Sequence, residues 1–171
     1  MRTVIRDTFP VTAKVYWDQV FFDRDFQLRM YREALGCPHV AILAATGEGA
    51  WDGPRSRRLV FQQPLQAPAA VQKLFGAAMR MEERGQFDPA SQRWTFQMIT
   101  EQMPERIQIR GQTWLAPVGE SAVERVCELD FSVSIFGVGA VVERFMVAAS
   151  ADNYAKQTRF VRGFLREKGL A

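Results

Sequence analysis

The strand and helix that span residues 123–143 constrain the fold of this chain more than any other stretch. From Val123 to Ile135 apolar and polar side chains alternate, with Glu124 and Glu128 among the polar ones. This period of two is typical of a strand in an antiparallel sheet with one dry and one wet side. A long amphipathic helix then begins at Ala140 and has to cover the dry side. A helix laid across a sheet in this way favours a pocket between the two layers, where an apolar molecule can be held.

Earlier segments complete an α+β pattern. Residues 2–9 indicate a first strand, and helical spacing follows over 12–21 and 23–36, where Gly36 and Pro38 end the second helix. Period-two segments then occur at 40–46, 57–63, 79–87, 94–98, 107–115 and 123–135, and residues 66–76 form either a short helix or an ordered loop. The pattern predicts a curved antiparallel sheet of about seven strands wrapped around a long C-terminal helix, with a short helical hairpin after the first strand. No repeat, low-complexity tract or linker interrupts it, so residues 1–171 are expected to form one domain.

Composition limits the class of protein. The chain has 171 residues, 47% of them hydrophobic and 24% charged, which is ordinary for a globular domain. No stretch approaches the ~20 apolar residues that span a bilayer, and charges at Arg2, Arg6 and Asp7 argue against an export signal. Two cysteines are too few for a disulfide framework, which favours a cytoplasmic protein with reduced thiols. The net charge of +3 comes without a dense basic stripe or a nucleic-acid module, so nucleic-acid binding is not expected.

Two motifs resemble a known superfamily. The junction Val133-Ser134-Ile135-Phe136-Gly137-Val138-Gly139-Ala140-Val141-Val142-Glu143 is similar to the strand-to-helix junction of small uncharacterised bacterial START-like proteins and of sterol-binding VASt domains. The opening Phe9-Pro10-Val11-Thr12-Ala13, continued by Phe21-Phe22-Asp23-Arg24-Asp25-Phe26, is similar as well. The resemblance extends over nearly the whole chain and implies the helix-grip fold of the START-like (SRPBCC) superfamily. It also implies a cavity for a lipid, sterol or polyketide, in proteins that range from carriers to aromatase/cyclases and chaperone activators.

No residue pattern points to a catalytic group, a metal or a cofactor. Gly137-x-Gly139 opens a helix, but Val142 stands where a dinucleotide motif needs its third glycine, so these glycines are expected to let the chain turn off the sheet. His39 is the only histidine, and no serine or cysteine elbow accompanies it. Cys37-x-His39 offers too few ligands for a closed zinc site. Glu143, in the first turn of the terminal helix, is expected to gain from the helix dipole rather than to act as an acid or base.

The dry face of the predicted sheet and the helical stripe opposite it define the expected ligand site. Its members are apolar side chains that share strand register or helical spacing, together with one inward-facing arginine. We expect the ligand to contact Met81, Trp94, Phe96, Met98, Ile107, Ile109, Arg125, Leu129, Phe131, Val142, Phe145 and Met146. Arg125 would be costly if buried alone, so it either lies near the open end of the cavity or pairs with a carboxylate such as Glu83. A structural ion pair is the preferred interpretation, and a ligand-orienting role is the alternative.

Two connections are long enough to move, and each carries an aromatic side chain that we expect to be exposed. These are the glycine-rich segment 47–54 with Trp51 and the segment 66–76 with Phe75, and we assign both to gating the cavity. The last helical turns are basic on one side, through Lys156, Arg159, Arg162, Arg166 and Lys168. A solvated face is the default interpretation, and transient contact with an anionic membrane surface is the alternative.

Three functions fit these expectations. The first is binding, and in some settings transport, of a hydrophobic small molecule such as a lipid or sterol, with no obligate protein partner. The second is a polyketide aromatase/cyclase-like enzyme that uses the same cavity, and a polar constellation deep in the pocket would favour it. The third is a protein-interaction module, which a filled core with a large exposed apolar patch would favour. Binding comes first because the sequence offers no evident catalytic group.

Overall fold

The computed structural model describes residues 1–47 and 53–171. Its strands are β1 (Arg2–Phe9), β2 (Val40–Thr46), β3 (Arg55–Pro64), β4 (Ala78–Asp88), β5 (Arg93–Thr100), β6 (Ile107–Val118) and β7 (Ala122–Val133). Its helices are α1 (Ala13–Tyr16), α2 (Arg24–Arg29), α3 (Ala69–Phe75) and α4 (Gly139–Glu167). Short π-helical segments continue α1 over Trp17–Phe21 and α2 over Met30–Ala34. Among the described residues, none of the helices is long and apolar enough to cross a membrane.

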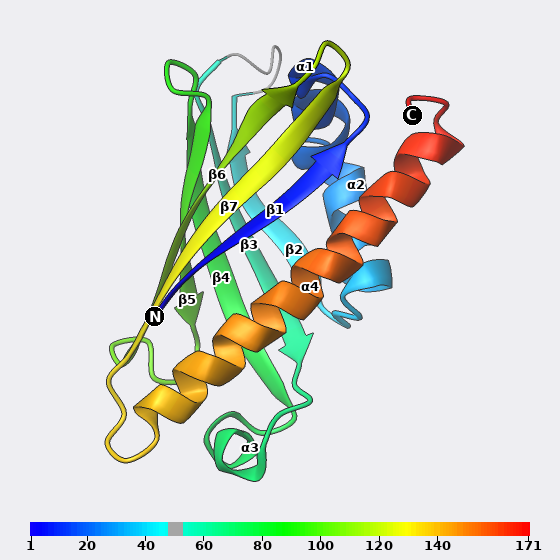
Figure 1. Cartoon of the computed structure of the whole chain (residues 1–171). Helices are drawn as coiled ribbons and strands as arrows, with labels where there is room; N and C mark the ends of the chain where they lie inside the picture. The colour runs from blue at the N-terminus through cyan, green and yellow to red at the C-terminus, as the bar shows by residue number, and fades with distance from the viewer. Residues whose placement is uncertain (48–52) are drawn as a thin grey trace.

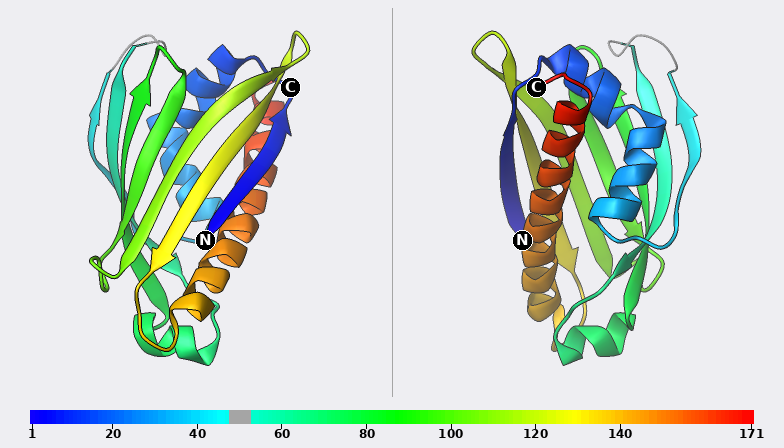
Figure 2. Two further views of the ribbon diagram at one scale, coloured as in Figure 1. Left: turned by 60° about the vertical axis from the view of Figure 1, so that its left-hand side comes forward. Right: turned by 90° about the vertical axis from the view of Figure 1, so that its right-hand side faces the viewer.

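The strands form one antiparallel sheet in the order β1-β7-β6-β5-β4-β3-β2 (Figure 1). From β2 to β7 each strand pairs with the next one in the chain, and β1 joins the free side of β7. The sheet curves around α4 and the helical hairpin, which both lie on its concave side (Figure 2). The predicted α+β architecture, with a sheet wrapped around a long C-terminal helix and a hairpin after the first strand, is confirmed.

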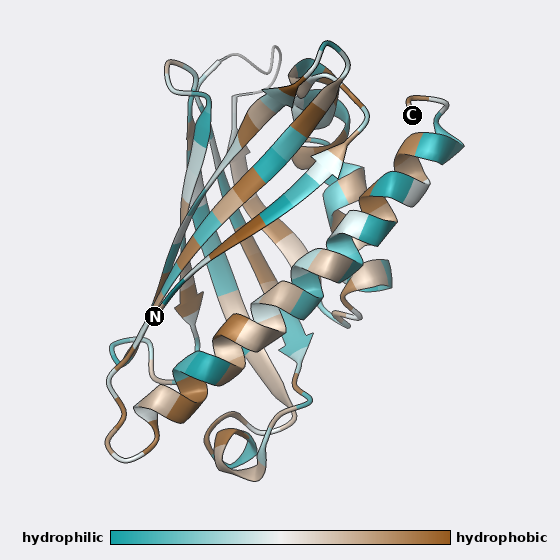
Figure 3. Ribbon diagram, viewed as in Figure 1, coloured by the Kyte–Doolittle hydropathy of each residue, from teal (hydrophilic) through white to brown (hydrophobic). Residues whose placement is uncertain are grey.

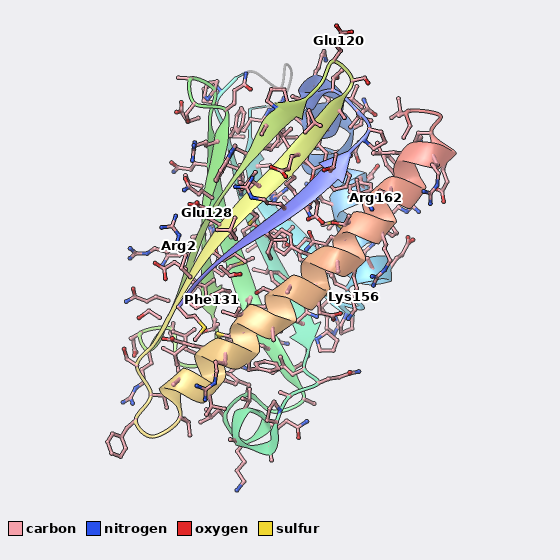
Figure 4. The ribbon with its side chains drawn as sticks, in the orientation of Figure 1. Arg2, Glu120, Glu128, Phe131, Lys156 and Arg162 are labelled. Carbon is pink, nitrogen blue, oxygen red and sulfur yellow. The ribbon has the colours of Figure 1, made fainter. Side chains whose placement is uncertain are left out.

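The alternation predicted for the last strand appears as a burial pattern. On β7 Val123, Cys127 and Phe131 are buried, and the hydropathy colouring alternates along the same strand (Figure 3). The opposite face carries ion pairs to β1, such as the one between Arg2 and Glu128 at 2.6 Å (Figure 4). One face of the sheet is therefore dry and the other wet, as a period of two requires.

Local signals in the sequence position the helical hairpin. The Thr12 hydroxyl accepts a hydrogen bond from the Val15 N–H, and the Asp23 carboxylate accepts one from the Phe26 N–H at 2.6 Å, so both residues cap helix N-termini. Gly36 has a φ of +66°, a left-handed conformation that glycine adopts at little cost and that ends the second helix. The hairpin packs against β2 and β3 and lies over the upper part of the concave face (Figures 1 and 2).

Two glycines control how the chain passes from β7 into α4. Gly137 has a φ of +78°, and a Cβ added to Gly139 would lie only 2.6 Å from the Val133 carbonyl oxygen. The first residue of the helix therefore approaches the strand more closely than a side chain would allow. Glu143 strengthens this corner because its carboxylate accepts the Val133 N–H at 2.9 Å, a bond that lowers the pKa of this carboxyl group.

Candidate functional site

An internal cavity of about 130 Å³ lies between the concave face of the sheet, the helical hairpin and the middle of α4. The sheet contributes Arg57, Phe61, Gln63, Met81, Glu83, Trp94, Phe96, Met98, Ile109, Thr113, Arg125, Leu129 and Phe131. The hairpin contributes Tyr16, Val20, Phe21, Gln27, Met30, Tyr31 and Leu35, and α4 contributes Ser150, Asn153, Tyr154, Gln157 and Val161. An apolar cavity of roughly 150 Å³ can hold one benzene molecule, so this space suits a ligand of about one ring.

Two glycines of the sheet shape the aromatic wall of this cavity. A Cβ added to Gly85 would lie 2.0 Å from Cζ2 of Trp94, and one added to Gly111 would lie 2.3 Å from Cζ of Phe96. The two rings therefore lie against bare backbone of the neighbouring strands β4 and β6. Because the rings stay close to the sheet, space remains above them for a ligand.

Eight of the twelve expected ligand-contacting residues line the cavity, namely Met81, Trp94, Phe96, Met98, Ile109, Arg125, Leu129 and Phe131. The other four, Ile107, Val142, Phe145 and Met146, pack instead with Val71 and Phe75 in a second hydrophobic cluster. The expectation that these four line the cavity is therefore wrong. Helix α4 crosses the sheet obliquely, so its first turns pack beside α3 and the residues from Ser150 to Val161 face the open space (Figure 1).

A buried ion pair lies in the cavity wall on β3 and β4. Nη2 of Arg57 donates to Oε1 of Glu83 at 2.7 Å, and Nε of Arg57 donates to the same oxygen at 3.2 Å. A further Arg57 nitrogen donates to the Phe21 carbonyl at 3.1 Å, and the guanidinium lies over the rings of Phe21 and Trp94. Sequence reasoning missed Arg57, although Arg57, Leu59 and Phe61 alternate on the inward face of β3.

Arg125 forms an ion pair with Asp7 rather than with Glu83. The Arg125–Asp7 distance is 2.6 Å, and the two residues face each other across β7 and β1. Arg125 also donates to the Thr158 hydroxyl at 3.1 Å and to the Tyr16 hydroxyl at 3.3 Å. These bonds connect β1, β7, the hairpin and α4, which supports the structural interpretation of this arginine.

The helical hairpin contributes Tyr31, a polar side chain to which the sequence analysis gave no role in ligand binding. Tyr31 is 5% exposed and lines the cavity, with its ring 4.8 Å from that of Phe61. Burial, with the nearby charge of Glu83, raises the pKa of the Tyr31 phenol, so the hydroxyl keeps its proton. The helical spacing of residues 23–36 identifies the buried face of this helix but not what that face packs against. The sequence therefore did not predict that Tyr31 lines a cavity.

The two cysteines are buried and unbridged. Burial raises the pKa of the Cys37 thiol to about 11, and it also raises the pKa of the Cys127 thiol. The Cys127 sulfur lies 2.8 Å from the Tyr154 hydroxyl, at the edge of the cavity. Both thiols are therefore protonated and unreactive at neutral pH.

The structure describes only one of the two segments that were predicted to gate the cavity. Phe75, the last residue of α3, is 4% exposed and packs in the same hydrophobic cluster as Val142, so its expected exposure is wrong. No residue of segment 66–76 lines the cavity. Trp51 lies outside the described residues. Ser150, Asn153 and Gln157 of α4 line the cavity and are only half-buried. These three side chains therefore lie partly in the cavity wall and partly at the surface.

The residues considered for chemistry in the sequence lie away from the cavity. His39 is exposed and lies near the start of β2, in a groove outside the sheet. Glu143 is engaged with the backbone of Val133. Within the part of the chain that the structure describes, no three His, Cys, Asp or Glu side chains are grouped to hold a metal ion.

The element order, the curved sheet and the long helix across it define the helix-grip fold. Similar solved structures have the same arrangement. The Zhui aromatase/cyclase from Streptomyces sp. R1128 has a TM-score of 0.69 at 14% identity, over 100% of this chain and 96% of that chain. A START superfamily protein from Mycobacterium smegmatis has a TM-score of 0.63 at 14% identity, over 97% of each chain. Norcoclaurine synthase from Thalictrum flavum, in complex with dopamine and hydroxybenzaldehyde, has a TM-score of 0.56 at 14% identity, over 94% of this chain and 87% of that chain.

The chain belongs to the family DUF2505, described as a protein of unknown function, whose model matches residues 5–165. No curated protein matches the chain. The solved structures confirm the START-like fold, and at their level of identity they show the fold alone. The likeness to VASt domains stays a prediction.

Proposed function

We propose that this protein binds one hydrophobic small molecule in the cavity beneath α4. The observation that carries the proposal is the cavity itself, about 130 Å³ of space above the rings of Trp94 and Phe96. A well-packed core leaves few voids larger than a water molecule, so a space of this size calls for a function. Its wall combines aromatic and methionine side chains with a few polar groups, which is typical of small-molecule sites.

The size of the cavity favours a compact ligand. Pockets for drug-sized ligands measure roughly 300–1,000 Å³, so the present cavity is below that range. An aromatic ring system buries about 150–250 Å², which at ~25 cal/mol per Å² contributes about 4–6 kcal/mol before the entropy cost of association. A whole sterol or lipid, the larger ligand class proposed from the sequence, requires α4 and the hairpin to move apart. Transport of such a ligand would use the same opening.

Native mass spectrometry tests the proposal directly. The purified protein should carry an added mass that is released on denaturation and can be identified after extraction. Met98→Trp should abolish the added mass because the larger side chain fills the cavity, whereas Leu43→Trp, at an exposed site on β2, should keep it. A protein without added mass that also takes up no apolar probe would contradict the proposal.

An aromatase/cyclase-like enzyme is the second candidate function. The observation that favours it is the polar group deep in the cavity, formed by Arg57, Glu83 and Tyr31. A carboxyl group and a phenolic hydroxyl in the wall of one cavity are groups that can act as general acid or base towards a bound polyketide. Incubation with a synthetic polyketide mimic should then yield a cyclised product in wild type and none in Glu83→Gln, while both proteins bind the mimic. Equal product in both proteins, or none in wild type, would count against the enzyme.

A protein-interaction module remains the third candidate, with nothing in the cavity to favour it.

Two further parts of the proposal concern the setting of the protein. The exposed Arg159 and Arg166, one heptad apart on α4, would allow transient contact with an anionic membrane surface. Vesicles with phosphatidylserine should then retain the protein better than neutral vesicles, and R159E/R166E should lose the difference. Equal retention on both kinds of vesicle would exclude the membrane contact.

The buried, unbridged cysteines suit the reducing cytoplasm, which fractionation of cells can check.

A further inference from the structure

The Tyr31 hydroxyl and Oε2 of Glu83 have no hydrogen-bond partner among the described residues. The same is true of Nε1 of Trp94 and Nε of Arg125, two further residues of the cavity wall. Tyr31 is 5% exposed and Glu83 is 6% exposed, and both line the same cavity. Buried polar groups in native proteins are almost always paired, so unpaired ones in a cavity point to a ligand that completes them.

The bonds of Glu83 show which kind of partner its free oxygen needs. Both hydrogen bonds from Arg57 go to Oε1, at 2.7 and 3.2 Å, so Oε2 can accept one more. The Arg57 guanidinium balances the charge of the Glu83 carboxylate, which offsets part of the cost of burying both side chains. A carboxylate oxygen only accepts hydrogen bonds, so the ligand group that meets it must be a donor.

Tyr31 supplies the complementary half of the site. Burial and the charge of Glu83 raise the pKa of its phenol, so the hydroxyl is present as a donor at neutral pH. That hydroxyl can donate to an oxygen of the ligand while Glu83 accepts from the same oxygen. A single hydroxyl group of the ligand would therefore satisfy both atoms.

The cavity offers no free positive charge to an anionic ligand. Among the residues that line it, Arg57 is paired with Glu83 and Arg125 is paired with Asp7. A carboxylate that entered would be buried without a cationic partner and would meet the charge of Glu83. Both effects disfavour it, because burying an unpaired charge is costly.

We infer that the ligand is a neutral, hydroxyl-bearing ring compound whose hydroxyl group is held between Tyr31 and Glu83. This inference rests on the proposed function and adds the chemical class of the ligand. It assigns the specificity of the cavity to one tyrosine and one glutamate, while the aromatic and methionine wall binds the ring. Hydrocarbons would bind more weakly, and carboxylates of the same size would be rejected.

Four probes of one size separate these contributions. Each probe is a toluene ring with one further group in the para position. This group is a hydroxyl in p-cresol, a methyl in p-xylene and a carboxylate in p-toluate. In 4-methylanisole it is a methoxy group, whose oxygen accepts hydrogen bonds but cannot donate them. Titrations followed by NMR of the methionine methyl groups give the four affinities. We expect p-cresol to bind about 3- to 10-fold more tightly than p-xylene or 4-methylanisole, as one or two net hydrogen bonds allow, and p-toluate to bind most weakly.

Tyr31→Phe is the decisive variant because it removes only the hydroxyl. The ratio of p-cresol to p-xylene affinity should fall towards one, and the folding stability should not decrease, since the lost hydroxyl has no partner in the protein. Thr100→Val is the matched variant, because it removes a buried hydroxyl that lies outside the cavity and already donates to the Gln102 carbonyl at 2.8 Å. It should keep the wild-type ratio of the two affinities.

The outcomes distinguish this inference from the proposed function. If p-xylene binds as tightly as p-cresol, or if Tyr31→Phe keeps the wild-type ratio, the cavity binds apolar molecules but the assigned class is wrong. Preferential binding of p-toluate would also overturn the class, in favour of an anionic ligand. Failure of all four probes to bind would contradict the proposed function itself.

Discussion

Replacement of Gly85 by alanine should destabilise the protein through a single clash in the cavity wall. A Cβ at this position would lie 2.0 Å from Cζ2 and 2.3 Å from Cε2 of Trp94. Non-bonded carbon atoms prefer separations of ~3.5–4.0 Å, so the indole ring has to retreat by roughly 1.5 Å. Trp94 lines the cavity, so the displaced ring can move into that space and would partly fill it.

The surroundings of Trp94 determine the size of the effect. The side chain is 1% exposed, its ring centroid lies 5.3 Å from that of Phe21, and the Arg57 guanidinium lies 5.0 Å from the ring. Moving a ring that is held on several sides is a case of overpacking, which typically costs about 1–3 kcal/mol. For a chain of this length that loss lowers the melting temperature by about 2–12 °C.

Gly163→Ala is the matched control. Gly163 lies within α4, and a Cβ added there would have no neighbour within 4 Å. The same substitution should therefore stabilise the protein, by about 0.5–1 kcal/mol, because alanine is the better helix former. Guanidinium denaturation followed by circular dichroism measures both changes, provided that the m-values agree. A free energy of unfolding for Gly85→Ala within about 0.5 kcal/mol of wild type would refute the clash.

Three further predictions concern buried and paired groups. Arg125→Met should lower the free energy of unfolding by about 3–5 kcal/mol, because it removes one partner of a buried ion pair; a loss below 1 kcal/mol in denaturant titrations would contradict this. Hydrogen bonds from Arg84 and Arg58 lower the pKa of Glu82 from 4.5 to about 2, so this carboxylate stabilises the protein above pH 4.5 and the contribution is lost as the pH falls towards 2. Between pH 4.5 and 2 the denaturant midpoint of Glu82→Gln should accordingly fall less than the midpoint of the wild-type protein. If the midpoints of the two proteins fell in parallel with pH, the lowered pKa of Glu82 would be contradicted. Cys37 should react with a thiol reagent only after unfolding, since burial raises its pKa to about 11; fast labelling of the native protein would show that the thiol is accessible.

Strand register was readable from the sequence, but the pairing of buried charges was not. The inward position of Arg125 follows from its alternation with Val123 and Cys127. Its partner is Asp7, from the strand at the opposite end of the chain, because β1 pairs with β7 with these two residues face to face. Alternation identifies a face, whereas an ion pair depends on which strands are neighbours and in which register.

The sequence predicted the cavity-lining residues of individual strands, but it did not predict which residues of the hairpin and of α4 face the cavity. Phe96 and Leu129 line the cavity as their register required. Tyr31 lies in the hairpin, whose helical spacing said nothing of what it covers. On α4 the expected contacts were placed too early in the helix, because helical periodicity identifies the apolar stripe but not the point at which the helix crosses the sheet.

By itself the sequence determined the secondary structure and the dry side of the sheet, because periods of 2 and 3.6 are local properties that each segment carries with it. It also determined the turn from β7 into α4, where Gly137 and Gly139 permit a conformation and a close approach that other residues resist. Only the tertiary structure decided that Arg57 pairs with Glu83, that Tyr31 faces the same cavity, and that α4 meets it between Ser150 and Val161. These features depend on strand order, on the path of the hairpin and on the angle of the helix. Each arises from contacts between segments far apart in the chain, which no local pattern encodes.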